Sequence, residues 1–203
     1  MGLGIYFGIA LLGCVMALAA AVWMRDLASA LLVPPTLLLG LSAASFAGIN
    51  GWLLWPRHAA WNDLSAFALP TLALVTMLIF VSVATAFGTR APRARWWPWA
   101  LAGAGVAVTA VLPFLSDSAS ARATAIVCTA LLVACIAVPA WAWWRGGDRH
   151  ALGLLIGMVC LAGPATTRVL RLVSVMPTGL ISRFVRLSGA ALQLAAVMVT
   201  LLW

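Results

Sequence analysis

The chain of 203 residues is 65% hydrophobic and has a mean hydropathy of +1.12. It carries 12 arginines but no lysine and no glutamate, and its four aspartates leave a net charge of +8. The charges separate apolar runs of about 18 residues or more, each long enough to cross the hydrocarbon of a bilayer as a helix. This composition excludes a water-soluble domain and indicates an integral membrane protein.

The apolar runs predict a series of transmembrane helices, separated by charges and helix breakers such as Arg25-Asp26 and the segment 90–95. The first run lacks a basic leader and a convincing cleavage site, so we expect it to be retained. Because the connections are short, we expect an all-α polytopic membrane protein, a seven-transmembrane-helix bundle with a single domain over residues 1–203. The expected spans are approximately 4–24, 28–50, 66–88, 97–115, 123–144, 151–172 and 185–203.

Arginines in the connections suggest an orientation. One side carries Arg25 and the arginines within 90–95 and 145–149, six in all. The other side carries Arg57, Arg122, Arg183 and Arg186, together with Arg168 and Arg171 if that pair ends the sixth span. If Arg168 and Arg171 face the bundle instead, the positive-inside rule favours an N-terminus outside and a cytoplasmic C-terminus at Trp203.

Polar and aromatic residues gather at the expected outer ends of the second, third, sixth and seventh spans. If they converge, they form a cationic cup with aromatic walls. Arg168 and Arg171 are three residues apart, as are Arg183 and Arg186, so each pair shares one helical face. Guanidinium groups suit the geometry of carboxylates and phosphates. The candidate ligand-binding residues are Trp52, Trp55, Arg57, His58, Trp61, Arg168, Arg171, Arg183 and Arg186.

A second interpretation of the same residues stays open. Tryptophan and arginine at helix ends also anchor membrane helices at the level of the lipid headgroups. Arg168 and Arg171 favour a pocket, because they lie at the end of an apolar run and no acidic residue is nearby in the sequence. Charge near membrane depth is costly unless it faces a cavity or an anion. The dense basic segment 90–97 is expected to anchor anionic lipid, with docking of an effector domain as the alternative.

Residues that other membrane functions require are missing from the expected spans. A retinal protein needs a lysine for its Schiff base, and the sequence has none. The aspartates are all expected in loops, whereas coupled transporters keep a carboxylate near mid-membrane. An odd number of spans without evident halves also argues against an inverted repeat. The serines of the spans have no histidine in the same layer and no nucleophile motif, so we expect no catalytic residues and no enzyme.

Cofactors, metals and nucleic acid are likewise not expected. His58 and His150 fall at opposite ends of the expected bundle, so they cannot share a haem. Cysteine spacing matches no metal site, and disulfides are not expected because every cysteine lies inside a span. The positive charge is spread around the membrane edges, whereas nucleic acid binding needs a basic face on a soluble surface. The cysteines concerned are Cys14, Cys128, Cys135 and Cys160.

Short motifs along most of the chain, from Tyr6-Phe7-Gly8 to the end, carry a family resemblance. They are Asn50-Gly51 followed by Leu54-Trp55-Pro56, then Arg145-Gly146 with Arg149 and Ala151, and finally Met176-Pro177 with Arg183, Gly189 and Gln193. In these motifs the sequence resembles the membrane region of the bacterial seven-transmembrane receptors with diverse intracellular signalling modules. Gln193 departs from the family pattern, since an acidic residue is expected there, and the segment 51–56 is shorter than usual.

The resemblance implies a sensor or receptor module of the bacterial inner membrane. An external or lipid-borne anionic or amphiphilic ligand would shift the bundle, and the last helix would pass the signal to an intracellular signalling domain or partner protein. Any catalytic output would belong to that effector. The alternative is a non-catalytic membrane subunit or scaffold that binds lipid or a partner membrane protein. Gly153 and Gly157 are expected to pack within the bundle, with a homodimer seam as the other option.

Overall fold

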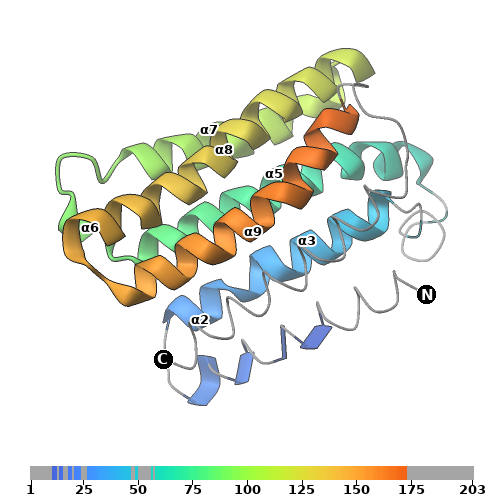
Figure 1. Ribbon diagram of the computed structural model, residues 1–203. Helices are drawn as coiled ribbons and strands as arrows, with labels where there is room; N and C mark the ends of the chain where they lie inside the picture. The colour runs from blue at the N-terminus through green and yellow to red at the C-terminus, as the bar shows by residue number, and fades with distance from the viewer. Residues whose placement is uncertain are drawn as a thin grey trace.

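A computed structural model describes residues 27–46 and 58–172 without interruption, together with 49, 56 and short stretches between 11 and 23. All regular structure in these residues is helical, so this part of the chain is all-α as predicted (Figure 1). The helices are α2 (Leu27–Leu31), α3 (Val33–Phe46), α5 (Ala59–Ala84), α6 (Phe87–Arg90), α7 (Trp97–Val111), the 3-10 turn η1 (Leu112–Phe114), α8 (Asp117–Gly146) and α9 (Arg149–Leu172).

Three described helices are long and apolar enough to cross a membrane, namely Trp61–Ala84, Trp97–Phe114 and Asp117–Gly146. They overlap the expected spans 66–88, 97–115 and 123–144. The expected spans 28–50 and 151–172 overlap α3 and α9, and the described side chains of these helices include the apolar stretches Val33–Ser45 and Arg149–Cys160. Most of 4–24 and all of 185–203 lie outside the described residues, so the seven-helix bundle and the single domain stay predictions.

Helix α5 begins seven residues before the expected span, at Ala59 instead of residue 66. Hydropathy identifies only the apolar part of a helix, whereas the polar first turns of α5 are helical as well. Asp63 therefore lies within α5, not in a loop as we expected. Helix α8 similarly begins at Asp117, where Ser116 adopts the extended backbone of an N-cap residue and the aspartate faces the positive end of the helix dipole. Both carboxylates still lie near helix ends, away from mid-membrane.

Helix α5 ends before its apolar run does. Ala86 adopts the left-handed conformation at φ 50°, which is unfavourable for a residue with a Cβ, and this residue turns the chain into α6. The amide of Ala86 bonds to the carbonyl of Val83 at 2.9 Å. The expected span 66–88 was therefore too long at this end, because side-chain hydropathy does not register a backbone turn.

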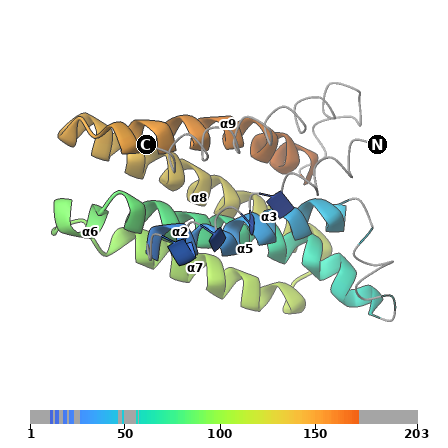
Figure 2. The same ribbon diagram turned by 90° about the horizontal axis from the view of Figure 1, so that it is seen from below.

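The centre of the described bundle is α5, which packs against α3, α7 and α8, while α8 also contacts α7 and α9. The second view shows α9 and α7 on opposite sides of the molecule, with α5 and α8 between them (Figure 2). Met77, Leu78, Leu131, Val138 and Met158 are fully buried in the core that these helices share. Burial of such side chains stabilises the packing of neighbouring helices through close contact.

Gly105 lets α7 approach its neighbours closely. A Cβ at this position would lie 2.5 Å from Cγ2 of Val75 on α5 and 3.3 Å from Cδ1 of Leu131 on α8. Small residues at such crossings are the usual way for membrane helices to come close together. Gly103, two residues earlier, has nothing within 4 Å of the equivalent point. The two glycines thus have different roles on the same helix.

The directions of the helices define two ends of the bundle. Helices α5 and α8 run in the same direction, and α7 and α9 run the opposite way (Figure 1). We call the end that contains α6, the connection 91–96, the end of α8 and the start of α9 the basic end. The opposite end, with the start of α5, η1, the start of α8 and the end of α9, is the distal end.

Candidate functional site

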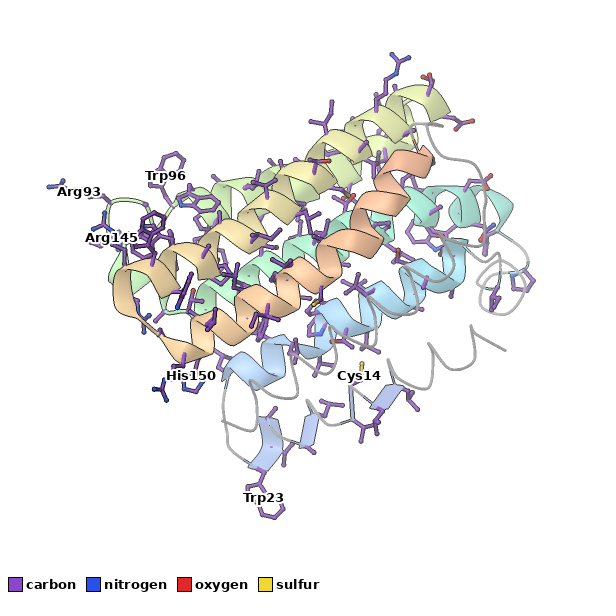
Figure 3. All side chains as sticks on the ribbon, in the orientation of Figure 1. Cys14, Trp23, Arg93, Trp96, Arg145 and His150 are labelled. Atoms are coloured by element: carbon purple, nitrogen blue, oxygen red, sulfur yellow. The ribbon has the colours of Figure 1, made fainter. Side chains whose placement is uncertain are left out.

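The predicted ligand-binding residues lie only partly in the described chain. His58 precedes α5 at the distal end, with an exposed side chain and a carbonyl that accepts hydrogen bonds from the amides of Trp61 and Asn62, both at 3.1 Å. Trp61, in the first turn of α5, is 45% exposed. Since His150, which Figure 3 labels, lies at the start of α9 and His58 precedes α5, the two histidines are at opposite ends of the bundle, as expected.

Arg168 and Arg171 belong to the last turns of α9, and the three-residue spacing puts them on one face of that helix. Because α9 runs from the basic end to the distal end, its last turns share an end of the bundle with His58 and Trp61 (Figure 1). The remaining candidates Trp52, Trp55, Arg57, Arg183 and Arg186 lie outside the described residues. The pocket as a whole therefore stays a prediction.

Beneath the distal end, the interior contains a set of small polar side chains that sequence reasoning missed. The hydroxyls of Ser45 on α3 and Ser65 on α5 are 3.0 Å apart, and Ser65 also donates to the carbonyl of Asn62 at 2.8 Å. The first bond joins α3 to α5, and the second lies within α5. The signal in the sequence was the i, i+3 spacing of Ser42 with Ser45 and of Asn62 with Ser65.

Some polar atoms of this region have no partner within the part of the chain that the structure describes. They are the hydroxyl oxygens of Ser42 and Thr124, on side chains with no exposed surface, and the side-chain oxygen of Asn62. A buried polar atom without a hydrogen bond costs about 1–3 kcal/mol, so such groups favour water or a polar ligand nearby. The hydroxyl of Ser82, near the other end of α5, is a fourth such atom, so three of the four lie toward the distal end.

At the basic end, Asp148 contacts two helices. Its Oδ2 accepts a hydrogen bond from Nη2 of Arg90 at 2.8 Å, and its Oδ1 accepts one from the backbone amide of His150 at 3.0 Å. The second bond makes Asp148 the N-terminal cap of α9. Burial by itself raises the pKa of Asp148, but the hydrogen bonds and positive charge from Arg90 and His150 outweigh it and hold the pKa below its ordinary value.

An aromatic cluster stabilises the same end. Phe87, which directly follows the left-handed Ala86, packs edge to face against Trp97 at 5.7 Å and against Trp141 at 5.1 Å between ring centroids. The guanidinium of Arg145 lies 5.9 Å from the Trp141 ring centroid. Such pairs contribute about 0.5–1.5 kcal/mol each beyond their buried area. The cluster ties α6, α7 and α8 together.

The thiols are unpaired and lie among apolar side chains. Sγ of Cys128 is 3.5 Å from the Thr71 hydroxyl, and Cys135 donates weakly to the carbonyl of Leu74 at 3.8 Å. No three histidine, cysteine or acidic residues of the described ranges come together as metal ligands. Cys128 and Cys135, both on α8, therefore pack as small side chains against α5.

Comparison with known proteins identifies the family. No curated protein and no solved structure matches the chain significantly. The model of the family described as "7TM diverse intracellular signalling" matches it over residues 1–203, the full length of the sequence. This agrees with the resemblance carried by the motifs and with the apolar helices of the structure. The chain therefore belongs to the 7TM diverse intracellular signalling family.

Proposed function

We propose that this membrane protein is a sensor module that binds an external or lipid-borne anionic or amphiphilic ligand at its distal end. The last helix, residues 185–203, then passes the change to an intracellular signalling domain or partner protein. The family match carries the proposal, because it covers the whole chain and names signalling as the family's role. Catalysis belongs to the effector in this proposal.

The arrangement at the distal end supports this location for the ligand. The last turns of α9, with Arg168 and Arg171, end where α5 begins with His58 and Trp61. The interior below contains the buried oxygens of Ser42 and Thr124, which have no partner among the described residues. An arginine fork would take the carboxylate or phosphate of the ligand, and an apolar chain would lie among the helix ends.

The arginine distribution supports the orientation. Among the described side chains, the basic end carries Arg90, Arg93, Arg95, Arg145 and Arg149, whereas Arg122 lies at the distal end. The positive-inside rule places the more basic side in the cytoplasm. The proposal is therefore an inner-membrane protein of a bacterial cell whose distal end faces outward and whose last helix ends in the cytoplasm.

The mechanism is a shift between two arrangements of the helices. A ligand moves such an equilibrium only by its difference in affinity for the two states. Arginines on α9 and on the last helix would bind one anion together only when those helix ends are close. The ligand therefore favours the close arrangement, and the opposite end of the last helix moves in response.

The test is a titration of the full chain in neutral nanodiscs with dodecanoate, with dodecyl maltoside as the uncharged amphiphile of equal chain length. Tryptophan fluorescence follows binding. Dodecanoate is expected to saturate the signal, and the double substitution Arg168→Gln with Arg171→Gln is expected to weaken binding on the order of tenfold or more, because charge-assisted hydrogen bonds are lost.

Arg122→Gln is the matched control, because it removes an exposed charge from the same end of the bundle, on α8. It should leave dodecanoate binding unchanged. Equal binding of both amphiphiles, or equal weakening by the control and the double variant, would refute the proposed site.

A membrane subunit that docks a partner remains the alternative, favoured by the outward face of α7, where Trp99 and Val106 are exposed. In that case neither amphiphile saturates the signal.

A further inference from the structure

Five arginines surround the basic end of the bundle. Arg90 ends α6, Arg93 and Arg95 lie in the connection to α7, Arg145 lies in the last turn of α8, and Arg149 begins α9. Within the part of the chain that the structure describes, Asp148 is the single carboxylate at this end. Five guanidinium groups against one carboxylate leave four positive charges here. We call these five arginines the basic rim.

Two members of the rim are held in place by the protein. Arg90 is bonded to Asp148 at 2.8 Å and passes beside Gly146, where a Cβ would lie 3.4 Å from its Nη1. Arg145 rests on the ring of Trp141. Arg93, Arg95 and Arg149 are exposed, and their charge has no carboxylate partner among the described side chains. The rim therefore combines fixed cations next to α8 with accessible cations around them.

Exposed tryptophans lie at the same level as the rim. Trp96 is 67% exposed and Trp144 is 90% exposed, while Trp99 and Trp143 on the adjoining turns are about half exposed. Figure 3 shows Trp96 at the same end as Arg93 and Arg145, with His150 at the start of α9. Indole rings with an apolar body and one N–H donor concentrate at the boundary between hydrocarbon and headgroups.

We propose that the basic rim binds the phosphate groups of anionic phospholipids in the leaflet at this end of the bundle. The three membrane-length helices α5, α7 and α8 all begin or end here, so the rim lies at headgroup depth. Arginine binds phosphate through paired N–H donors, and anionic headgroups attract each basic side chain near the surface. The outward tryptophans favour lipid over a soluble acidic partner, which would leave these rings in water.

This site is distinct from the proposed signal site, which is at the other end of the bundle. The rim would fix the depth and tilt of α8 and of the start of α9 against the headgroups, because Arg145 and Arg149 belong to those helices. The lipid is recognised through its phosphodiester charge, not through the acyl chains. Zwitterionic lipid, whose phosphate is neutralised by its own ammonium group, should bind more weakly.

The experiment measures lipid selectivity around the full chain in phosphatidylcholine vesicles. Spin-labelled phosphatidylglycerol and spin-labelled phosphatidylcholine report the fraction of each lipid held at the protein surface. We expect preference for phosphatidylglycerol that decreases with added salt, because exposed charges are screened. Replacing both exposed arginines of the connection, Arg93→Gln with Arg95→Gln, is expected to reduce the association constant of the anionic lipid roughly thirtyfold, because each arginine contributes about 1 kcal/mol.

Two single substitutions that each remove one positive charge show at which end of the bundle the anionic lipid binds. Arg93→Gln should lower the selectivity, and Arg122→Gln, at the other end of α8, should not. Equal selectivity in the wild-type chain for the two lipids would overturn the proposal, and so would equal losses in both single variants. Inorganic phosphate at constant ionic strength should not displace phosphatidylglycerol. Displacement would show that the rim takes free phosphate instead. Circular dichroism checks that each variant keeps its helices.

Discussion

Arg90 and Asp148 are 58 positions apart in the sequence, yet Nη2 of the arginine lies 2.8 Å from Oδ2 of the aspartate. The bond joins the short helix α6 to the first turn of α9. The same carboxylate receives the His150 amide, so one side chain both caps a helix and holds a second one. This arrangement predicts that the two roles of Asp148 can be separated by substitution.

Asp148→Ala is expected to lower thermal stability more than Asp148→Asn. Alanine removes the cap and the ion pair together, whereas asparagine is itself a good N-terminal cap and removes only the charge. The loss of the cap costs about 1 kcal/mol. The pair adds less than about 1 kcal/mol, because the Arg90 side chain is 40% exposed. Melting curves of the detergent-purified variants measure this, with Arg90→Gln expected to match Asp148→Asn.

The contribution of the ion pair should depend on pH. The pKa of Asp148 is lower in the folded protein than its ordinary value of about 3.9, so the pair stabilises the fold fully above that value. Stability from the pair is lost as the pH falls through the lowered pKa. The difference in melting temperature between wild type and Asp148→Asn should therefore be constant near neutral pH and decrease below about pH 4. A difference that grows on acidification would contradict this assignment.

Gly105 and Gly103 provide a matched pair of substitutions on α7. Gly105→Ala places a methyl group 2.5 Å from Val75 Cγ2, so we expect destabilisation by about 1–3 kcal/mol from overpacking. Gly103→Ala meets nothing within 4 Å and should stabilise the helix by about 0.5–1 kcal/mol. Thermal unfolding of both variants in the same detergent distinguishes the two. If both substitutions changed stability in the same direction, that result would contradict the close packing of α7 against α5 and α8 at Gly105.

Two residues of the basic end, Ala86 and Gly147, have a left-handed backbone, which favours glycine over alanine. Replacing Ala86 with glycine should therefore stabilise the fold, and replacing Gly147 with alanine should destabilise it. Ala86→Gly removes the steric cost of a Cβ at φ 50°, and we expect a gain of about 1 kcal/mol. Gly147 ends α8 at φ 60°, with its amide bonded to the carbonyl of Trp143. Gly147→Ala introduces the same strain and should cost about 1 kcal/mol. If Ala86→Gly lost stability, residue 86 would not have the left-handed backbone conformation described here.

Much of the helical pattern was predictable, because membrane helices need long apolar runs whatever their neighbours are. The expected span 97–115 matches α7 with η1 to within a residue at each end. Helix ends were less predictable. Asp63 and Asp117 lie inside helices, since polar first turns are compatible with helix formation but are invisible to hydropathy. The turn at Ala86 has no sequence signal at all, because alanine normally favours helix.

Sequence reasoning found at which end of the bundle the charged residues of the described chain lie, but not which side chains contact one another. It identified the basic segment 90–97 and the histidines at opposite ends, because these depend only on topology. It did not find the bond from Arg90 to Asp148, which depends on how α6 packs beside α9. The buried hydroxyls of Ser42 and Thr124 were also missed, since single polar residues barely change the hydropathy of an apolar run.

Transmission from the distal end to the last helix is tested most directly by a distance measurement. Spin labels are placed at exposed position 144 on α8 and at position 201 in the last expected span, in a full chain whose native cysteines are replaced. Electron resonance measures the distance distribution. Saturating dodecanoate is predicted to shift this distribution, and Arg168→Gln with Arg171→Gln is predicted to reduce the shift at the same dodecanoate concentration. An unchanged distribution at saturating, verified binding would contradict the account, because the ligand would then bind without moving the helix.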